Sequence, residues 1–137
     1  MWSAICLEKR MYSERKILMV DDKTTLCFAM REYFKLCNYQ VDCAHGVDEA
    51  AKLLNASCYA VVIADLDLSG THNLDGFEVV KMVHERFTET RVIVLTAYGS
   101  ADVEAKAREC GVSAFLHKPK PLSEVARIVF ELVGDGR

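Results

Sequence analysis

One stretch constrains this chain more than any other: an apolar run that stops abruptly at two carboxylates. The run VVIA at 61–64 is followed by Asp65 and, one residue later, by Asp67. A short, continuous apolar run of this kind is typical of a strand buried on both faces of a sheet. Why such a strand ends in two aspartates is a question that the rest of the chain has to answer.

Short apolar runs alternate with amphipathic stretches along nearly the whole chain. They predict strands at 16–20, 39–44, 59–64, 91–95 and 113–116. Apolar side chains at the spacing of one helical face predict helices at 24–37, 47–54, 76–87, 101–110 and 122–133. This alternation indicates an α/β fold, with a doubly wound five-stranded parallel sheet covered by helices on both faces.

The composition fits one domain. The chain has 137 residues, 51% of them apolar and 27% charged, which is an ordinary globular balance. We expect a loosely ordered extension at 1–14, the domain at 15–134 and a short tail at 135–137. The net charge of −3 gives no reason, by charge alone, to expect a nucleic-acid or membrane partner.

The cysteines and the first residues indicate the compartment. The six cysteines contain no C-x-x-C pair, which argues against a zinc site or a disulfide scaffold. No apolar run approaches the roughly 20 residues of a membrane-spanning helix, and the first apolar stretch is too short for a signal peptide. We therefore expect reduced thiols and a cytoplasmic protein.

Polar side chains follow the predicted strands at the same end each time. The first strand is followed by Asp21 and Asp22, the third by Asp65 and the fifth by Lys118, and the fourth ends in Thr96. Ligands collect outside the carboxyl ends of parallel strands, so we expect these groups to converge in one pocket. Capping of the first helix is the plain alternative for the first pair, but it does not account for the other strand ends.

These residue types suit the acceptance of a phosphoryl group. Neighbouring carboxylates repel one another unless a cation intervenes, and Mg²⁺ takes carboxylate and phosphate oxygens as ligands. A carboxylate can also act as a nucleophile and form an aspartyl phosphate. A lysine ammonium and a threonine hydroxyl would then contact the phosphate oxygens.

The chain resembles the response regulator receiver domain of two-component signalling over about residues 15–134. Each matching piece is weak alone, but together and in this order they are specific. The pieces are VDD at 20–22, VVIADLDLSG at 61–70, DG at 75–76, VLTAYGS at 94–100 and FLHKPKP at 115–121. The resemblance implies the flavodoxin-like (βα)5 receiver fold, with a cis peptide bond before Pro119.

The resemblance also implies roles for the residues at the acceptor. Asp65 would be the phosphoacceptor, and Mg²⁺ would be held by Asp21, Asp22, Asp65 and the backbone carbonyl of Asp67. Such a protein catalyses only its own phosphorylation and dephosphorylation, so it is not a turnover enzyme.

A second set of implied roles concerns phosphate binding and switching. Thr96 and Lys118 would contact the phosphoryl group. Thr96 would move inward on phosphorylation and Phe115 would pack behind it, which would change the face formed by the fourth helix, the fifth strand and the fifth helix.

The implied partners follow from this chemistry. The phosphoryl donor would be a phosphohistidine on a sensor histidine kinase or a histidine phosphotransfer protein, which would dock on the first helix near Thr24. An unknown downstream protein or output domain would read the switched face, and a homodimer on that face is an open alternative.

The chain departs from the family in the loop after the acceptor. Ser69 stands where the family usually has proline, and the loop through 70–73 is about three residues longer than usual. We expect Asp67 and Tyr98, each two residues beyond a site residue, to tune the lifetime of the phosphate.

Two other readings compete with the receiver. Asp65 and Asp67 also resemble the D-x-D opening of haloacid-dehalogenase-type phosphatases, in which the first aspartate is the nucleophile. Against this, the nucleophile strand opens the domain in that family, whereas two predicted strands precede Asp65 here. The third reading is a receiver-like interaction module that takes no phosphate, and the retained acceptor, lysine and threonine argue against it.

Overall fold

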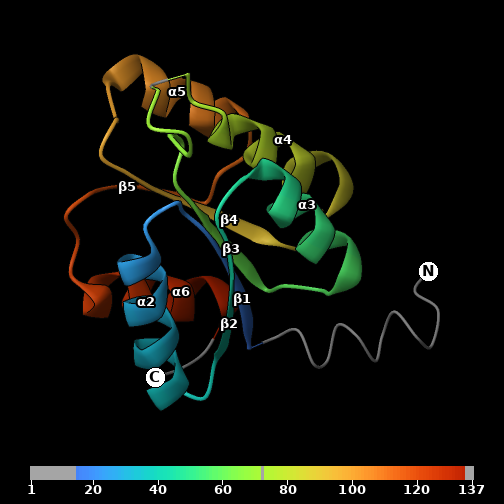
Figure 1. The fold of residues 1–137 in the computed structure, drawn as a ribbon, viewed down its shortest axis with the longest axis vertical. Coiled ribbons are helices and arrows are strands. Elements are labelled where there is room, and N and C mark those ends of the chain that lie inside the picture. The colour runs from blue at the N-terminus through green and yellow to red at the C-terminus, as the bar shows by residue number, and fades with distance from the viewer. Residues whose placement is uncertain (1–14, 72, 135–137) are drawn as a thin grey trace.

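The computed structural model describes residues 15–71 and 73–134, so the predicted extension at 1–14 and tail at 135–137 lie outside the described residues. Five parallel strands form one sheet in the order β2-β1-β3-β4-β5 (Figure 1). The strands are β1 (Lys16–Val20), β2 (Gln40–Ala44), β3 (Val61–Ala64), β4 (Arg91–Thr96) and β5 (Ala114–His117). The predicted doubly wound α/β fold is confirmed.

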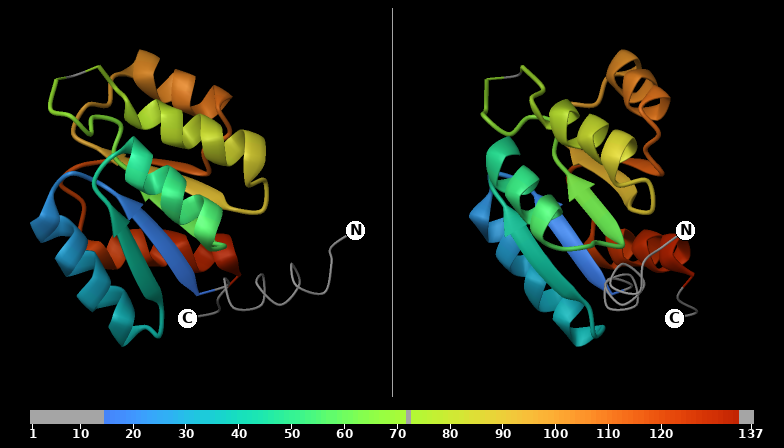
Figure 2. Two further views of the ribbon diagram at one scale, coloured as in Figure 1. Left: turned by 45° about the vertical axis from the view of Figure 1, so that its right-hand side comes forward. Right: turned by 90° about the vertical axis from the view of Figure 1, so that its right-hand side faces the viewer.

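Five helices among the described residues cover the two faces of the sheet (Figure 2). They are α2 (Thr24–Leu36), α3 (Val47–Ala56), α4 (Gly76–Arg86), α5 (Ala101–Glu109) and α6 (Leu122–Val133). Successive side chains of a strand point to opposite faces, so Ile17 packs with α2 and α6 while Leu18 packs with α3 and α4. Each fully buried aliphatic side chain of this kind contributes roughly 1.5–3 kcal/mol to folding.

The strand order places the site. The chain passes from β1 outward to β2 and then returns to β3 on the other side of β1, so the order reverses between β1 and β3. In the register of the sheet, Val20 pairs with both Ala44 and Ala64. The carboxyl ends of β1 and β3 therefore lie beside each other, at the point where doubly wound sheets bind ligands.

The predicted boundaries hold to within about two residues. The third strand begins at Val61 rather than at Tyr59, and the first helix ends at Leu36, after which Asn38 has a positive φ of 65°. In the described part of the chain, no helix has both the length and the apolar character that crossing a bilayer would require.

Candidate phosphoacceptor site

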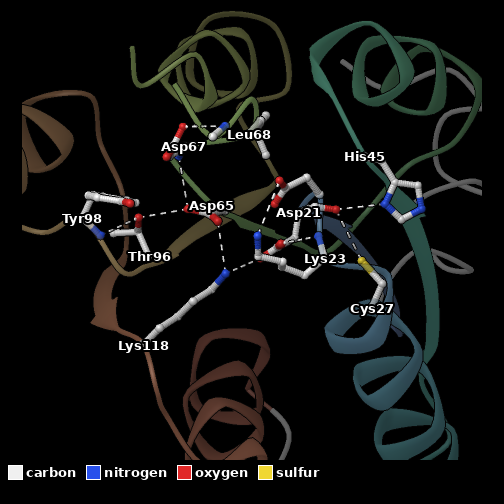
Figure 3. A network of polar contacts seen from close by, with 12 residues as sticks. Asp21, Lys23, Cys27, His45, Asp65, Asp67, Leu68, Thr96, Tyr98 and Lys118 are labelled. Carbon is white, nitrogen blue, oxygen red and sulfur yellow. Dashed lines mark hydrogen bonds and ion pairs between the residues drawn. The ribbon is translucent and has the colours of Figure 1, made fainter. Parts of the chain in front are cut away.

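Backbone hydrogen bonds carry the sheet pattern one residue past the strands and so bring the polar side chains together. The Asp65 amide donates to the Val20 carbonyl at 2.9 Å, and the Lys118 amide donates to the Thr96 carbonyl at 2.9 Å. The Asp21 amide donates to a carbonyl of β2 at 3.0 Å. The predicted convergence of groups from four strand ends is therefore observed (Figure 3).

The Asp65 carboxylate lies at the centre of this cluster and is only 6% exposed. One oxygen, Oδ1, accepts a hydrogen bond from Thr96 Oγ1 at 2.9 Å and another from the Asp67 amide at 3.2 Å. The other oxygen, Oδ2, is 3.1 Å from Lys118 Nζ. Hydrogen bonds fix both oxygens, which orients the carboxylate (Figure 3).

Lys118 bridges Asp65 to the fully buried Asp21. Its Nζ atom is 2.6 Å from Asp21 Oδ2, and the Lys23 amide donates to the other Asp21 oxygen at 2.8 Å. Burial raises the pKa of Asp21 above its ordinary value although Lys118 opposes the shift. Burial alone would lower the pKa of Lys118, but its hydrogen bond to Asp21 and the charges of Asp21 and Asp65 raise it, so the ammonium stays charged.

Three carboxylates at this edge are placed to share a cation. Oxygens of Asp21, Asp22 and Asp65 lie within 4.8 Å of one another. Asp22 is the most exposed of the three, so it faces solvent, from which an ion would arrive. An all-oxygen donor set that leaves room for water and phosphate ligands fits the preference of Mg²⁺.

Helix capping does not explain the acidic pair. The residue that precedes the first turn of α2 is Lys23, and no side chain caps that turn. Asp21 instead turns its carboxylate toward Lys118. The alternative interpretation of this pair as a helix cap is thus not supported.

Asp67 closes the loop that follows β3. Its side chain is 5% exposed, and its carboxylate accepts a hydrogen bond from the Gly70 amide at 3.1 Å. The Asp67 amide donates to the acceptor carboxylate, so the residue holds both the loop and Asp65. The role of its backbone carbonyl as a metal ligand stays a prediction.

Asp75 and Gly76 support this loop in a way that sequence reasoning missed. The Asp75 carboxylate accepts a hydrogen bond from the Leu68 amide at 2.9 Å, and the Gly76 amide donates to the Leu66 carbonyl at 2.8 Å. A Cβ atom on Gly76 would overlap the Asp65 carbonyl oxygen and lie 2.6 Å from Leu66 Cα. In the sequence, the Asp-Gly pair at the start of a predicted helix was the feature that could have indicated this close approach of the backbones.

The two predicted switch residues lie inward. Thr96 is fully buried and already donates to Asp65, and it accepts a hydrogen bond from the Tyr98 amide at 3.2 Å. Phe115 is 7% exposed and meets the His117 ring edge-on, with 5.4 Å between ring centroids. Both side chains are therefore buried in this structure, and their movement on phosphorylation stays a prediction. The Lys118-Pro119 peptide bond is cis.

Comparison with known proteins identifies the family of this chain. The family model of the response regulator receiver domain matches residues 17–130. The transcriptional regulatory protein ResD of Bacillus subtilis is 36% identical over 118 residues, which cover 85% of this chain and 47% of ResD. Sporulation initiation phosphotransferase F of Bacillus subtilis is 29% identical over 110 residues, which cover 80% of this chain and 86% of that protein.

Solved structures share the fold. A CheY-like receiver domain from Methanospirillum hungatei matches with a TM-score of 0.82 at 20% identity. The match covers 88% of this chain and 94% of that receiver domain. A Burkholderia pseudomallei response regulator with a phosphorylated aspartic acid has a TM-score of 0.78 at 24% identity and covers 88% of this chain and 69% of its own. This chain spans between about a quarter and three fifths of several longer curated relatives.

Proposed function

The chain belongs to the response regulator receiver domain family, and from that premise we propose that it is a Mg²⁺-dependent phosphoacceptor switch with Asp65 as the acceptor. The family model that matches is that of receivers, over residues 17–130, so the receiver interpretation is favoured over the phosphatase interpretation. We further propose that the chain does not turn over a separate substrate and modifies only itself.

The proposal rests on one observation: each of the two Asp65 carboxylate oxygens is contacted by a different donor side chain. Thr96 holds Oδ1 and Lys118 holds Oδ2, so each donor is within reach of the oxygens of a phosphoryl group bonded to this carboxylate. These donors are set in advance, in a buried site where a fixed charge is worth more than in water.

The proposed step is an in-line transfer. A carboxylate oxygen of Asp65 attacks the phosphorus of a phosphohistidine, a P–O bond forms as the P–N bond breaks, and the imidazole leaves with the bonding electron pair. Lys118 and Thr96 bind the phosphoryl oxygens as they take up charge. Mg²⁺, held by Asp21, Asp22, Asp65 and the Asp67 carbonyl, would neutralise charge on the transferring group.

Exposed apolar side chains on α2 support a docking surface for the donor protein. Phe28 is 64% exposed and Leu36 is 86% exposed. α2 begins directly after the acidic pair, so a histidine kinase or phosphotransfer protein seated there would approach Asp65. The cognate partner would recognise this helix.

The face formed by α5, β5 and α6, the fourth helix, fifth strand and fifth helix of the sequence, is the proposed output surface. Phe115 and His117 of β5 pack against Gly99, which precedes α5. A shift of Thr96 on phosphorylation would pass through this packing to the surface. A downstream protein, an output domain or a second copy of the chain would read it. An NtrC4 receiver domain of the same fold is a dimer when activated by beryllofluoride.

Intact mass spectrometry tests the proposal. The protein is incubated with Mg²⁺ and a small acyl-phosphate donor, with Asp65→Asn in parallel. We expect one phosphoryl group on the parent, none on the variant and none when a chelator removes Mg²⁺. Steady release of phosphate without a mass gain would point instead to a phosphatase or a very short-lived acyl phosphate. Neither gain nor release would favour the phosphate-independent module.

A further inference from the structure

Two cysteines lie in contact on the β2 side of the sheet and have no part in the proposed phosphotransfer. Cys27 is on α2 and is 3% exposed, whereas Cys43 is on β2 and is partly exposed. Cys43 Sγ lies 3.7 Å from the Cys27 backbone carbonyl oxygen, to which it donates, and both cysteines line one hollow. Two cysteines brought this close by the packing of α2 on β2 are candidates for a covalent bond.

The surroundings of Cys43 favour its thiolate. The hydrogen bond from Cys27 is the largest cause that lowers the pKa of Cys43 to about 7, and the charges of Arg31 and His45 lower it further, against the effect of burial. Arg31 is held beside β2 because its Nε donates to the Val41 carbonyl at 3.3 Å. The thiolate is the nucleophilic form of cysteine, so Cys43 is the attacking member of the pair.

The pair opens to solvent through a shallow hollow of about 490 Å³. Thr24, Phe28, Arg31 and His45 line it together with the two cysteines. The guanidinium of Arg31 suits a small molecule that carries a carboxylate, and the hollow is open enough for such a molecule to reach Cys43.

We propose that Cys27 and Cys43 form a reversible redox pair that is oxidised by low-molecular-weight disulfides of anionic thiols. The Cys43 thiolate attacks one sulfur of the disulfide RSSR, forms a mixed disulfide and expels RS⁻. Cys27, after losing its proton, attacks the Cys43 sulfur and expels the second RS⁻, so the chain gains one disulfide and the oxidant becomes two molecules of RSH. Two electrons pass from the pair to the oxidant.

The pair also touches the phosphoacceptor site, a link that rests on the proposed function. Cys27 Sγ lies 3.6 Å from the Asp21 backbone carbonyl oxygen, and His45 Nδ1 lies 2.9 Å from the same oxygen (Figure 3). The single Cys27 proton is donated to this oxygen while Cys43 is itself a thiol, and to Cys43 when Cys43 is a thiolate. Oxidation removes the S–H donor from Cys27. The Asp21 carbonyl then loses one of the two side chains that contact it, and we expect phosphorylation to slow.

Peptide mapping without any phosphodonor tests the redox pair independently of the proposed function. The reduced full chain is incubated with glutathione disulfide, its remaining thiols are alkylated, and the tryptic peptides are sequenced by mass spectrometry. We expect a cross-link between the peptides 24–31 and 36–52, with the bond at Cys43 and not at Cys37. Cys37→Ser is the matched control and should keep the cross-link.

Two variants separate the steps of the reaction. Cys43→Ser should abolish the cross-link, and Cys27→Ser should stop at a glutathione adduct on Cys43. A parent protein that carries adducts only on the exposed Cys58, or an adduct on Cys43 that never proceeds to the cross-link, would overturn the redox pair. Equal rates of phosphoryl gain in the oxidised and reduced proteins would overturn the link to Asp21.

Discussion

The two edges of the sheet differ in chemistry and in shape. At the amino ends of the strands lies a hollow of about 710 Å³, bordered by residues such as Tyr59, Phe87 and Arg91. The polar groups nearby hydrogen-bond one another and so stabilise the fold. Tyr59 donates to Asp42 Oδ2 at 2.7 Å, and Thr90 Oγ1 donates to the Tyr59 carbonyl at 2.7 Å. At the carboxyl ends of β1, β3 and β5, the charged side chains of Asp21, Asp65 and Lys118 face one another.

The difference teaches that chemistry and topology locate this site better than open volume does. Across the described residues 15–71 and 73–134, the group of carboxylates placed to hold a metal ion is at the carboxyl edge. The amino edge has the roomier hollow and lacks such a group in that part of the chain. Substitutions at the two edges should therefore separate effects on phosphorylation from effects on stability.

The largest expected effect comes from Lys118. Replacing it with methionine removes the ammonium that contacts Asp65 and Asp21, and loss of a preorganised charge of this kind slows the step by about 10²-fold. Initial rates of phosphoryl gain by intact mass measure it. Arg91→Met at the amino edge is the control and should leave the rate unchanged. A similar loss in both variants would erase the distinction between the edges.

Gly76→Ala should give the largest loss of stability among these changes. The added Cβ would overlap backbone atoms after β3, and overpacking against backbone costs about 2 kcal/mol. Urea unfolding measures the change. Gly46→Ala is the matched control, because nothing lies within 4 Å of a Cβ there, and its effect should stay within about 0.5 kcal/mol. Equal losses in the two variants would show that the close approach at Gly76 is not tight.

Tyr59→Phe should lower the free energy of unfolding by about 1.5 kcal/mol, because its hydroxyl bonds a carboxylate, and should leave phosphorylation unchanged. Burial, then the hydrogen bond and charge of Asp42, raise the pKa of Tyr59 above its ordinary value of 10.0. Because the pKa is higher in the folded protein, the stabilisation by this hydroxyl is complete below the ordinary pKa of 10.0. It is lost as the pH rises through the raised pKa of the folded protein. Unfolding curves should converge for parent and variant in alkaline solution, and a gap that widened there would contradict this sign.

The smallest expected effect concerns phosphate lifetime. Tyr98 is 43% exposed and its amide donates to Thr96, so its ring lies at the rim of the acceptor site (Figure 3). Tyr98→Ala should admit water and speed dephosphorylation by about fivefold, a change of about 1 kcal/mol in the barrier. Tyr98→Phe keeps the ring and should match the parent. Unchanged decay in the alanine variant would remove this role.

Much of the fold and the site could be predicted because local patterns determine them. Apolar runs located the strands, and the first one or two residues after a run included Asp21, Asp65 and Lys118. The rule that ligands gather at the carboxyl ends of parallel strands then brought these residues together.

The supporting contacts could not be predicted because they depend on how distant segments approach. Asp75 was noted only as part of a motif, and its bond to the Leu68 amide requires the loop to fold back on itself. Nothing in the sequence indicated that the His45 ring, just after β2, would bond the Asp21 carbonyl. The contact between Cys27 and Cys43 likewise arises only when α2 packs on β2.

The central claim is that Asp65 takes the phosphoryl group, and its chemical fate tests this most directly. Borohydride reduces an aspartyl phosphate to homoserine, which marks the acceptor in a peptide sequence. After reaction with an acyl-phosphate donor and Mg²⁺, reduction and digestion, we expect homoserine at position 65 and none without Mg²⁺. Homoserine at Asp67 or Asp22, or at no position in a protein that consumes the donor, would contradict the account.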